Sequence, residues 1–80
     1  MEIIRLISWF DKNTEKLIGE FDISHIQLFV LKEIFNPPKS DPLMYNPYDI
    51  DKKIKGKIVN IVDIEFNFEK YVYQLDCFQK

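Results

Sequence analysis

Residues 2–11 read EIIRLISWFD, and residues 17–23 read LIGEFDI. The first stretch mixes β-branched and aromatic side chains, contains no glycine or proline, and ends at the turn signal Asp-Lys-Asn. These features predict a strand. The connection at residues 12–14 is too short for a parallel crossover, so we expect the second stretch to pair antiparallel with the first. The two stretches therefore predict a β-hairpin.

A helix is expected directly after this hairpin. Ser24 and Gln27 have the S-x-x-Q spacing of a capping box, in which the two side chains satisfy backbone donors of a starting helix. Apolar residues then recur at three- and four-residue steps until Asn36-Pro37-Pro38, where proline stops the pattern because it lacks an amide donor. These signals predict a helix over 26–36. Its apolar side consists of Ile26, Phe29, Val30, Ile34 and Phe35.

The rest of the chain predicts two further strands and one ambiguous segment. All 4 prolines lie within 37–49, and we expect a short strand around 43–49 at a sheet edge, where a missing amide is tolerated. Residues 52–62 fit a helix that begins after Asp51, whereas the spacing over 54–66 also fits one face of a strand. Gly56 weakens the helix interpretation by about 1 kcal/mol. Residues 69–78, EKYVYQLDCF, alternate as a final strand.

Length and composition bound the class of protein. With 80 residues, 46% of them hydrophobic, the chain suffices for one folded domain and is too apolar for a disordered segment. Its 11 Lys and Arg residues are balanced by 13 Asp and Glu residues, which argues against a nucleic-acid partner. No apolar run approaches the ~18 residues of a membrane span, no signal-peptide pattern is visible, and Cys77 alone cannot form an internal disulfide. We therefore expect a cytoplasmic protein without a membrane segment.

Residue types that carry catalysis or bind metals are sparse. His25 is the one imidazole, and we favour a structural role at the helix start over a catalytic one. One His and one Cys leave no ligand-spaced zinc cluster, and 2 glycines cannot form a phosphate-binding loop. Carboxylates two residues apart are interpreted as a solvated face rather than a glycosidase pair. We therefore expect no enzyme activity, no cofactor and no metal site.

The aromatic residues allow three interpretations: core, a stacking platform for single-stranded nucleic acid, or a protein interface. Acidic neighbours on the same strands would repel phosphate, which disfavours the platform. Tyr, Trp and Phe are enriched at the buried centre of protein interfaces. We therefore expect those aromatic residues that lie outside the core to bind protein. The aromatic residues to which these three interpretations apply are Trp9, Phe10, Tyr45, Tyr48, Tyr71 and Tyr73.

Residues 8–20, SWFDKNTEKLIGE, resemble the signature of the cloacin immunity family, the small inhibitors of ribosome-cleaving colicins. That family has a comparable W-F-D-K-x-T-E-x-x-x-G-E run near the N-terminus and ends in an aromatic strand, which 69–76 resembles. The middle of the chain departs from the family. The segments LMYNPY, residues 43–48, and YQLDCFQ, residues 73–79, resemble instead a poorly characterised bacterial domain family.

The resemblance implies an α+β fold over a single immunity-like domain, 1–80. It implies a four-stranded antiparallel sheet, one helix (26–36) packed on one face, and a second short helix (52–62). In the family the open face of the sheet meets the toxin, and the position that matches Phe10 is a contact. By strand alternation, Leu6, Ser8 and Phe10 would then point to the partner. The same alternation leaves Ile3, Ile7 and Trp9 for the core and turns Arg5 inward, where it needs a carboxylate or the strand's end.

The function that the resemblance implies is a non-catalytic immunity protein that binds and inhibits a cognate nuclease toxin, a ribonuclease in the family. Acidic groups would draw in the toxin's basic groove, and Phe10 with Tyr45 or Tyr73 would hold it. The alternative is a small interaction or scaffold domain that forms a homodimer through Leu6, Phe10 and Val72. The expected partner-binding residues are Phe10, Asp11, Leu17, Glu20, Asp22, Tyr45, Val72, Gln74 and Asp76.

Overall fold

A computed structural model, which describes residues 2–79, contains a four-stranded antiparallel sheet and two short helices. The expected α+β fold class is confirmed. The strand order is β2-β1-β4-β3, so the first and last strands lie side by side at the centre. The elements are β1 (Ile3–Asp11), β2 (Leu17–Asp22), α1 (Leu28–Phe35), β3 (Tyr48–Ile50), α2 (Lys52–Ile58) and β4 (Tyr71–Gln79).

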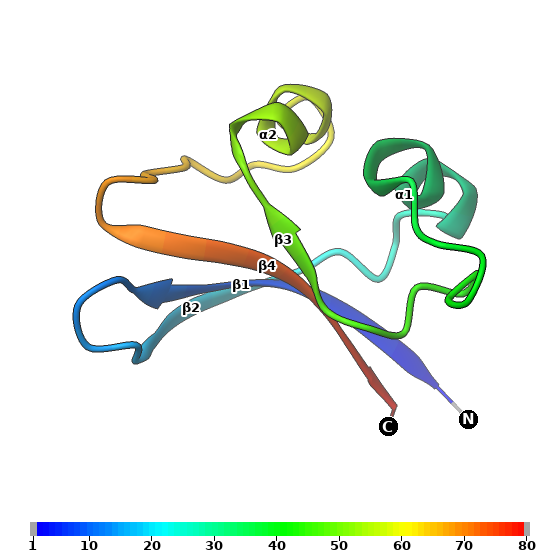
Figure 1. The fold of residues 1–80 in the computed structure, drawn as a ribbon, viewed down its shortest axis with the longest axis horizontal. Coiled ribbons are helices and arrows are strands. Elements are labelled where there is room, and N and C mark those ends of the chain that lie inside the picture. The colour runs from blue at the N-terminus through cyan, green and yellow to red at the C-terminus, as the bar shows by residue number, and fades with distance from the viewer. Residues whose placement is uncertain (1, 80) are drawn as a thin grey trace.

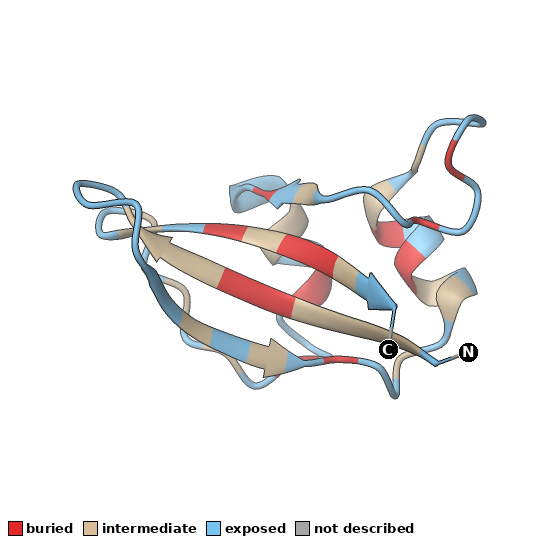
Figure 2. Ribbon diagram, turned by 90° about the horizontal axis from the view of Figure 1, so that it is seen from below, coloured by how far each residue is buried: buried red, intermediate tan, exposed pale blue. Residues whose placement is uncertain are grey.

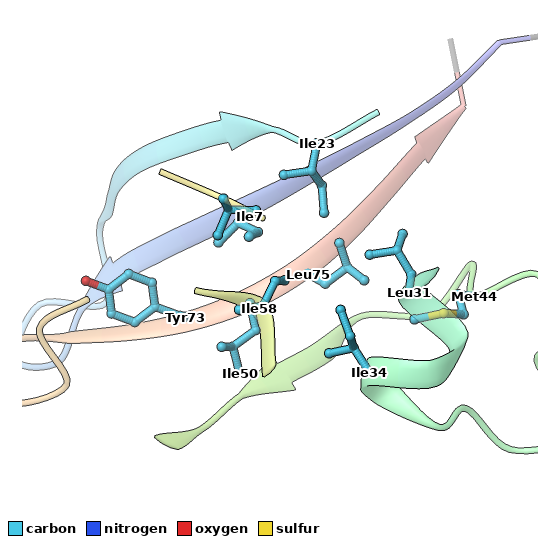
Figure 3. Close-up of a cluster of buried hydrophobic side chains, with 10 residues drawn as sticks. Ile7, Ile23, Leu31, Ile34, Met44, Ile50, Ile58, Tyr73 and Leu75 are labelled. Carbon is cyan, nitrogen blue, oxygen red and sulfur yellow. The ribbon is translucent and has the colours of Figure 1, made fainter. Parts of the chain in front are cut away.

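Both helices lie on the same side of the sheet, as Figure 1 shows, and no other described segment covers the opposite side. Figure 2 views the molecule from that uncovered side, with the strands in front of the helices. We call the helix side of the sheet the covered face and the other side the open face. The hydrophobic core fills the space between sheet and helices (Figure 3). Its buried members are Ile7, Ile23, Leu31, Ile34, Met44, Ile50, Ile58, Val62, Tyr73 and Leu75.

Alternation along β1 decides which side chains are buried. Ile7 is fully buried and Trp9 packs against the core, which confirms the side expected for both. Arg5 also points inward, where its Nη2 donates to the carbonyl of Leu43 at 2.8 Å. Of the two conditions expected for an inward Arg5, a position near the strand's end is met, because β1 begins at Ile3. A backbone carbonyl pairs with Arg5 where a carboxylate was the alternative, and its buried Nε makes no hydrogen bond.

Gly19 on β2 gives Trp9 room on the covered face. The two residues are in register, and a Cβ at Gly19 would lie 2.3 Å from a carbon of the Trp9 ring. Gly19→Ala should therefore displace the indole and destabilise the fold by about 1–3 kcal/mol. Gly56→Ala is the control, because a Cβ there meets nothing within 4 Å and should stabilise α2 by about 0.5–1 kcal/mol. Urea denaturation measures both, and a neutral Gly19→Ala would contradict this packing.

The expected capping box is not formed, and α1 begins at Leu28 rather than at residue 26. Ser24 Oγ accepts a hydrogen bond from the backbone N–H of Arg5 at 3.0 Å, so this side chain extends the contacts of β1 and is not available as a helix cap. Gln27 is the N-cap residue, and its side chain makes no capping hydrogen bond. Most of the expected apolar side does face the core, because Ile34 is buried and Ile26, Val30 and Phe35 pack against the core cluster. Phe29 is the exception at 61% exposed, and Leu31, which was not expected on this side, is fully buried.

The proline-rich segment forms a loop before a short edge strand. α1 ends where expected, with Asn36 in the left-handed region, but β3 spans only Tyr48–Ile50 instead of 43–49. Two interactions hold residues 41–46 away from the sheet. Met44 is fully buried in the core, and the carboxylate of Asp41 accepts hydrogen bonds from the backbone of Tyr45, the backbone of Asn46 and the hydroxyl of Tyr48. These local bonds replace ladder pairing.

Asp41 should contribute stability that depends on pH. The Tyr48 hydroxyl and the two backbone amides hold the pKa of Asp41 below its ordinary 3.8, while burial and Asp41 raise the pKa of Tyr48 to about 12. Because the pKa of Asp41 is lower in the folded state than in the unfolded state, its stabilising effect is complete at pH values above the unfolded-state pKa. The effect is lost as the pH falls through the folded-state pKa. Asp41→Asn should therefore be less stable than wild type at neutral pH, with a gap that narrows in acid. Urea midpoints across pH measure this gap.

Asp63→Asn is the matched control for Asp41→Asn, because Asp63 is exposed and lies outside the hydrogen-bond network of the loop. Its stability should follow that of the wild type at every pH. A gap for Asp41→Asn that stays constant down to pH values well below 3.8 would contradict the assigned role of Asp41.

Residues 52–58 settle the ambiguous segment as a helix. Asp51 caps α2 by accepting a hydrogen bond from the N–H of Ile54 at 2.9 Å, so the helix begins where expected and ends at Ile58, before residue 62. The strand interpretation of 54–66 is wrong. Ile58 and Val62 would lie on the same face of such a strand. In the structure Ile58 reaches the core from the last turn of α2, and Val62 reaches it from the turn that follows the helix.

Candidate protein interface on the open sheet face

The open face has apolar side chains at both ends and, apart from Leu6, polar side chains between them. In register, Phe10 pairs with Val72 at one end and Ile4 pairs with Phe78 at the other. Between these pairs lie a row centred on Ser8 and a row centred on Leu6. The partners of Ser8 in these rows are Glu20 and Gln74, and those of Leu6 are Asp22 and Asp76.

The apolar end near Phe10 is hollowed. A shallow cavity of about 340 Å³ is lined by Phe10, Val72, Gln74 and three residues of the adjoining hairpin, Asp11, Lys12 and Glu15. The register of β1 and β2 shifts by one residue beside Phe10, which pairs with Leu17 and leaves Ile18 as the extra residue of a bulge. Leu17, Ile18 and Val72 are each about half exposed, so this end offers apolar surface to a partner.

The charged residues that alternation places on the open face are all acidic. They differ in burial, because Glu20, Asp22 and Asp49 are exposed whereas Asp76 is only 8% exposed. Gln74 Nε2 donates a hydrogen bond of 2.6 Å to Asp76 Oδ1. The hydrogen bond from the backbone N–H of Ser24 is the largest cause that lowers the pKa of Asp22, which favours its charged form. The open face therefore carries negative charge at neutral pH.

The structure brings together most of the residues that the sequence placed at the interface. Asp11 lies at the hairpin end of β1, where its carboxylate accepts hydrogen bonds from the backbone of Asn13 and Thr14, and these lower its pKa. It thus stabilises the hairpin turn as well as lining the cavity. Leu17 lies opposite Phe10. The remaining predicted residues that share the open face are Phe10, Glu20, Asp22, Val72, Gln74 and Asp76.

Two predicted aromatic anchors lie elsewhere. Tyr73 is 2% exposed in the core, and its hydroxyl accepts a hydrogen bond from the backbone of Asn67, so the expectation that it holds a partner is wrong. Tyr45 lies beside Ile3 and Cys77 around a cavity of about 250 Å³. That position is at the opposite end of β1 from Phe10, so the two aromatic rings do not form one contact surface.

Asp49 and Phe78 belong to the open face but were not among the predicted partner-binding residues. Phe78 is 50% exposed, and the alternation of the last strand contains the signal that places it beside Asp76. Asp49 pairs with Gln74 across β3 and β4. No sequence signal locates Asp49, because the register of a three-residue edge strand depends on the loop before it.

Residues 2–79 contain neither a membrane-spanning helix nor a cluster of metal-ligating side chains. None of the helices is long and apolar enough to cross a membrane. No three His, Cys, Asp or Glu side chains in this range gather as a metal ion would require.

A sheet with helices on one face and an acidic, partly apolar surface on the other defines an open-faced α+β sandwich. The chain belongs to the family described as "Domain of unknown function (DUF7683)", whose model matches residues 4–76. This range runs from the beginning of β1 into β4 and includes both helices. No curated protein matches the chain. The resemblance to the cloacin immunity family stays a prediction.

Proposed function

We propose that this protein is a non-catalytic immunity protein, which binds a cognate nuclease toxin through the open face and thereby inhibits it. The observation that carries the proposal is an uncovered sheet face whose charged strand residues are all acidic and whose ends are apolar. Contiguous apolar side chains left on a protein surface commonly mark an interaction site. The resemblance of residues 8–20 to the cloacin immunity signature supports the same function, because that hairpin forms one edge of this face.

The charge of the open face suits a nuclease better than the net charge of the chain suggests. A nuclease needs a basic groove to hold phosphates, so a complementary inhibitor must offer carboxylates. The net charge of −2 would steer such a partner only weakly. However, many of the balancing cations lie on α2, across the sheet from the open face (Figure 1). These cations are Lys52, Lys53, Lys55 and Lys57.

The same charges disfavour the alternative, a homodimer formed through the open face. Two copies that met face to face would bring the carboxylates of their strands together, with Lys12 of the hairpin turn as the cation beside the cavity to offset them. Like charges across an interface cost several kcal/mol. A partner with a basic surface has no such penalty. We therefore propose the toxin as the occupant of this face.

The test uses, as the candidate toxin, the product of the gene next to that of this protein. The purified proteins should form a one-to-one complex with submicromolar affinity by calorimetry, and RNA cleavage by the toxin should stop at stoichiometric inhibitor. Light scattering of the protein alone should give the 9.7 kDa monomer. Failure to bind at micromolar concentration would overturn the proposal, and a dimer that buries Phe10 would favour the scaffold alternative.

A further inference from the structure

We propose that Asp76 is the anchoring carboxylate of the open face and receives one cationic side chain, arginine or lysine, of the bound partner. Gln74 is the positioning residue that holds this carboxylate in place. The inference rests on the proposed function and deepens it, because it separates one acidic residue from the others. Asp76 would decide how slowly the complex dissociates, whereas the exposed carboxylates would govern how fast it forms.

The burial of Asp76 sets it apart. It lies on β4, a central strand, in register with Leu6, and is only 8% exposed although no helix covers this face. Asp22 lies on the other side of Leu6, on the edge strand β2, and is exposed. The two carboxylates therefore flank the same leucine in the same row of the sheet. They differ in contact with water and in hydrogen-bond donor, which is the backbone N–H of Ser24 for Asp22 and the side chain of Gln74 for Asp76. A comparison of Asp76 with Asp22 therefore compares a buried with an exposed carboxylate in the same row of the sheet.

The hydrogen bonds of Asp76 leave acceptor capacity unused. A carboxylate has about four acceptor positions. Among residues 2–79, Gln74 is the one side chain that donates to Asp76, at 2.6 Å, and no lysine or arginine pairs with it. The carboxylate has thus lost most of its contact with water and has gained only one neutral donor. A cationic side chain that arrived with a partner would supply charge-assisted hydrogen bonds to a group that is already oriented and largely desolvated.

The consequence for binding follows from how interfaces use charges. Charges at an exposed rim mainly change the association rate and its dependence on salt, whereas removal of one member of a buried pair changes the dissociation rate. Asp76 has the buried position, and Asp22, Glu20 and Asp49 have the rim positions. Loss of the charge at Asp76 would also leave the partner's cation buried without a counterion, which adds to the effect.

The experiment compares Asp76→Asn with Asp22→Asn in binding kinetics against the neighbouring toxin domain, at low and at physiological salt. Both changes remove one negative charge and keep the shape of the side chain. Asp76→Asn should raise the dissociation rate about 30-fold or more, with a small effect on association. Asp22→Asn should lower the association rate a few-fold and weaken its salt dependence, with the dissociation rate unchanged. Equal dissociation rates for the two variants would overturn the inference.

A double-mutant cycle tests the positioning role and excludes a folding defect. Each basic residue at the toxin's active groove is changed to alanine and measured against wild type and against Asp76→Asn. One of these changes should be nearly silent in the Asp76→Asn background, and Gln74→Ala should add little there. If the loss of binding free energy from each basic-residue change simply adds to the loss from Asp76→Asn, no specific pair exists. This conclusion would hold even if Asp76→Asn unfolds more readily. No binding by the wild type would refute the proposed function, and this inference with it.

Discussion

Ile7→Ala is expected to lower the free energy of unfolding by about 2–5 kcal/mol. Ile7 is fully buried at the middle of β1, in register with Phe21 on β2 and Leu75 on β4. The truncation leaves a cavity beneath β1. Because β1 is paired with β2 on one side and with β4 on the other, the sheet cannot move to close this cavity. A domain of this length has on the order of 4–12 kcal/mol of stability in total, so the variant should lose a large part of it.

Urea denaturation followed by the fluorescence of Trp9, the single tryptophan, measures the change. Val72→Ala is the matched control on the open face, where the side chain is 44% exposed, and should cost less than about 1 kcal/mol. A Val72→Ala variant as unstable as Ile7→Ala would mean that the open face is covered in solution, which would contradict the assignment of the two faces.

The hairpin and the last strand could be predicted because their residues carry the signal themselves. Alternation and a short turn are local properties, and β1, β2 and β4 begin and end within two residues of the expected positions. The start of α1 could not be predicted in this way. Ser24 has the spacing of a helix cap, but it follows β2 closely enough to bond to the backbone of Arg5 instead. A tertiary contact thus overrides a local pattern, and the sequence does not show the contact.

In the candidate site, too, local alternation predicts some features and tertiary packing decides others. Once β1 was oriented by the resemblance, alternation placed Phe10, Val72 and Asp76 on one face, and their positions in the sheet agree. Tyr73 is not an anchor, because the same alternation that places Val72 and Gln74 on the open face turns Tyr73 toward the core. The burial of Asp76 is a different kind of fact. It depends on the packing of neighbouring side chains across the sheet, which alternation does not describe.

Phe10→Ala is expected to weaken the complex with the toxin about 30-fold, or about 2 kcal/mol, while the fold stays intact. Phe10 is partly exposed on the open face, in register with Val72, and its ring lines the shallow cavity near the hairpin. A partner side chain that filled this cavity would remove apolar surface of both molecules from water. The alanine variant loses the wall of the cavity and the contact area together.

Phe29→Ala is the matched control, because it removes the same ring from a site that is 61% exposed on α1, on the covered side of the sheet (Figure 1). Toxin affinity, measured by calorimetry for both variants alongside their urea midpoints, should fall for Phe10→Ala and stay at the wild-type value for Phe29→Ala. The reverse result would place the partner on the helix layer. Because the two substitutions have the same chemistry, such a reversal could be explained only by the position of the interface, and the open face would then have no role in binding.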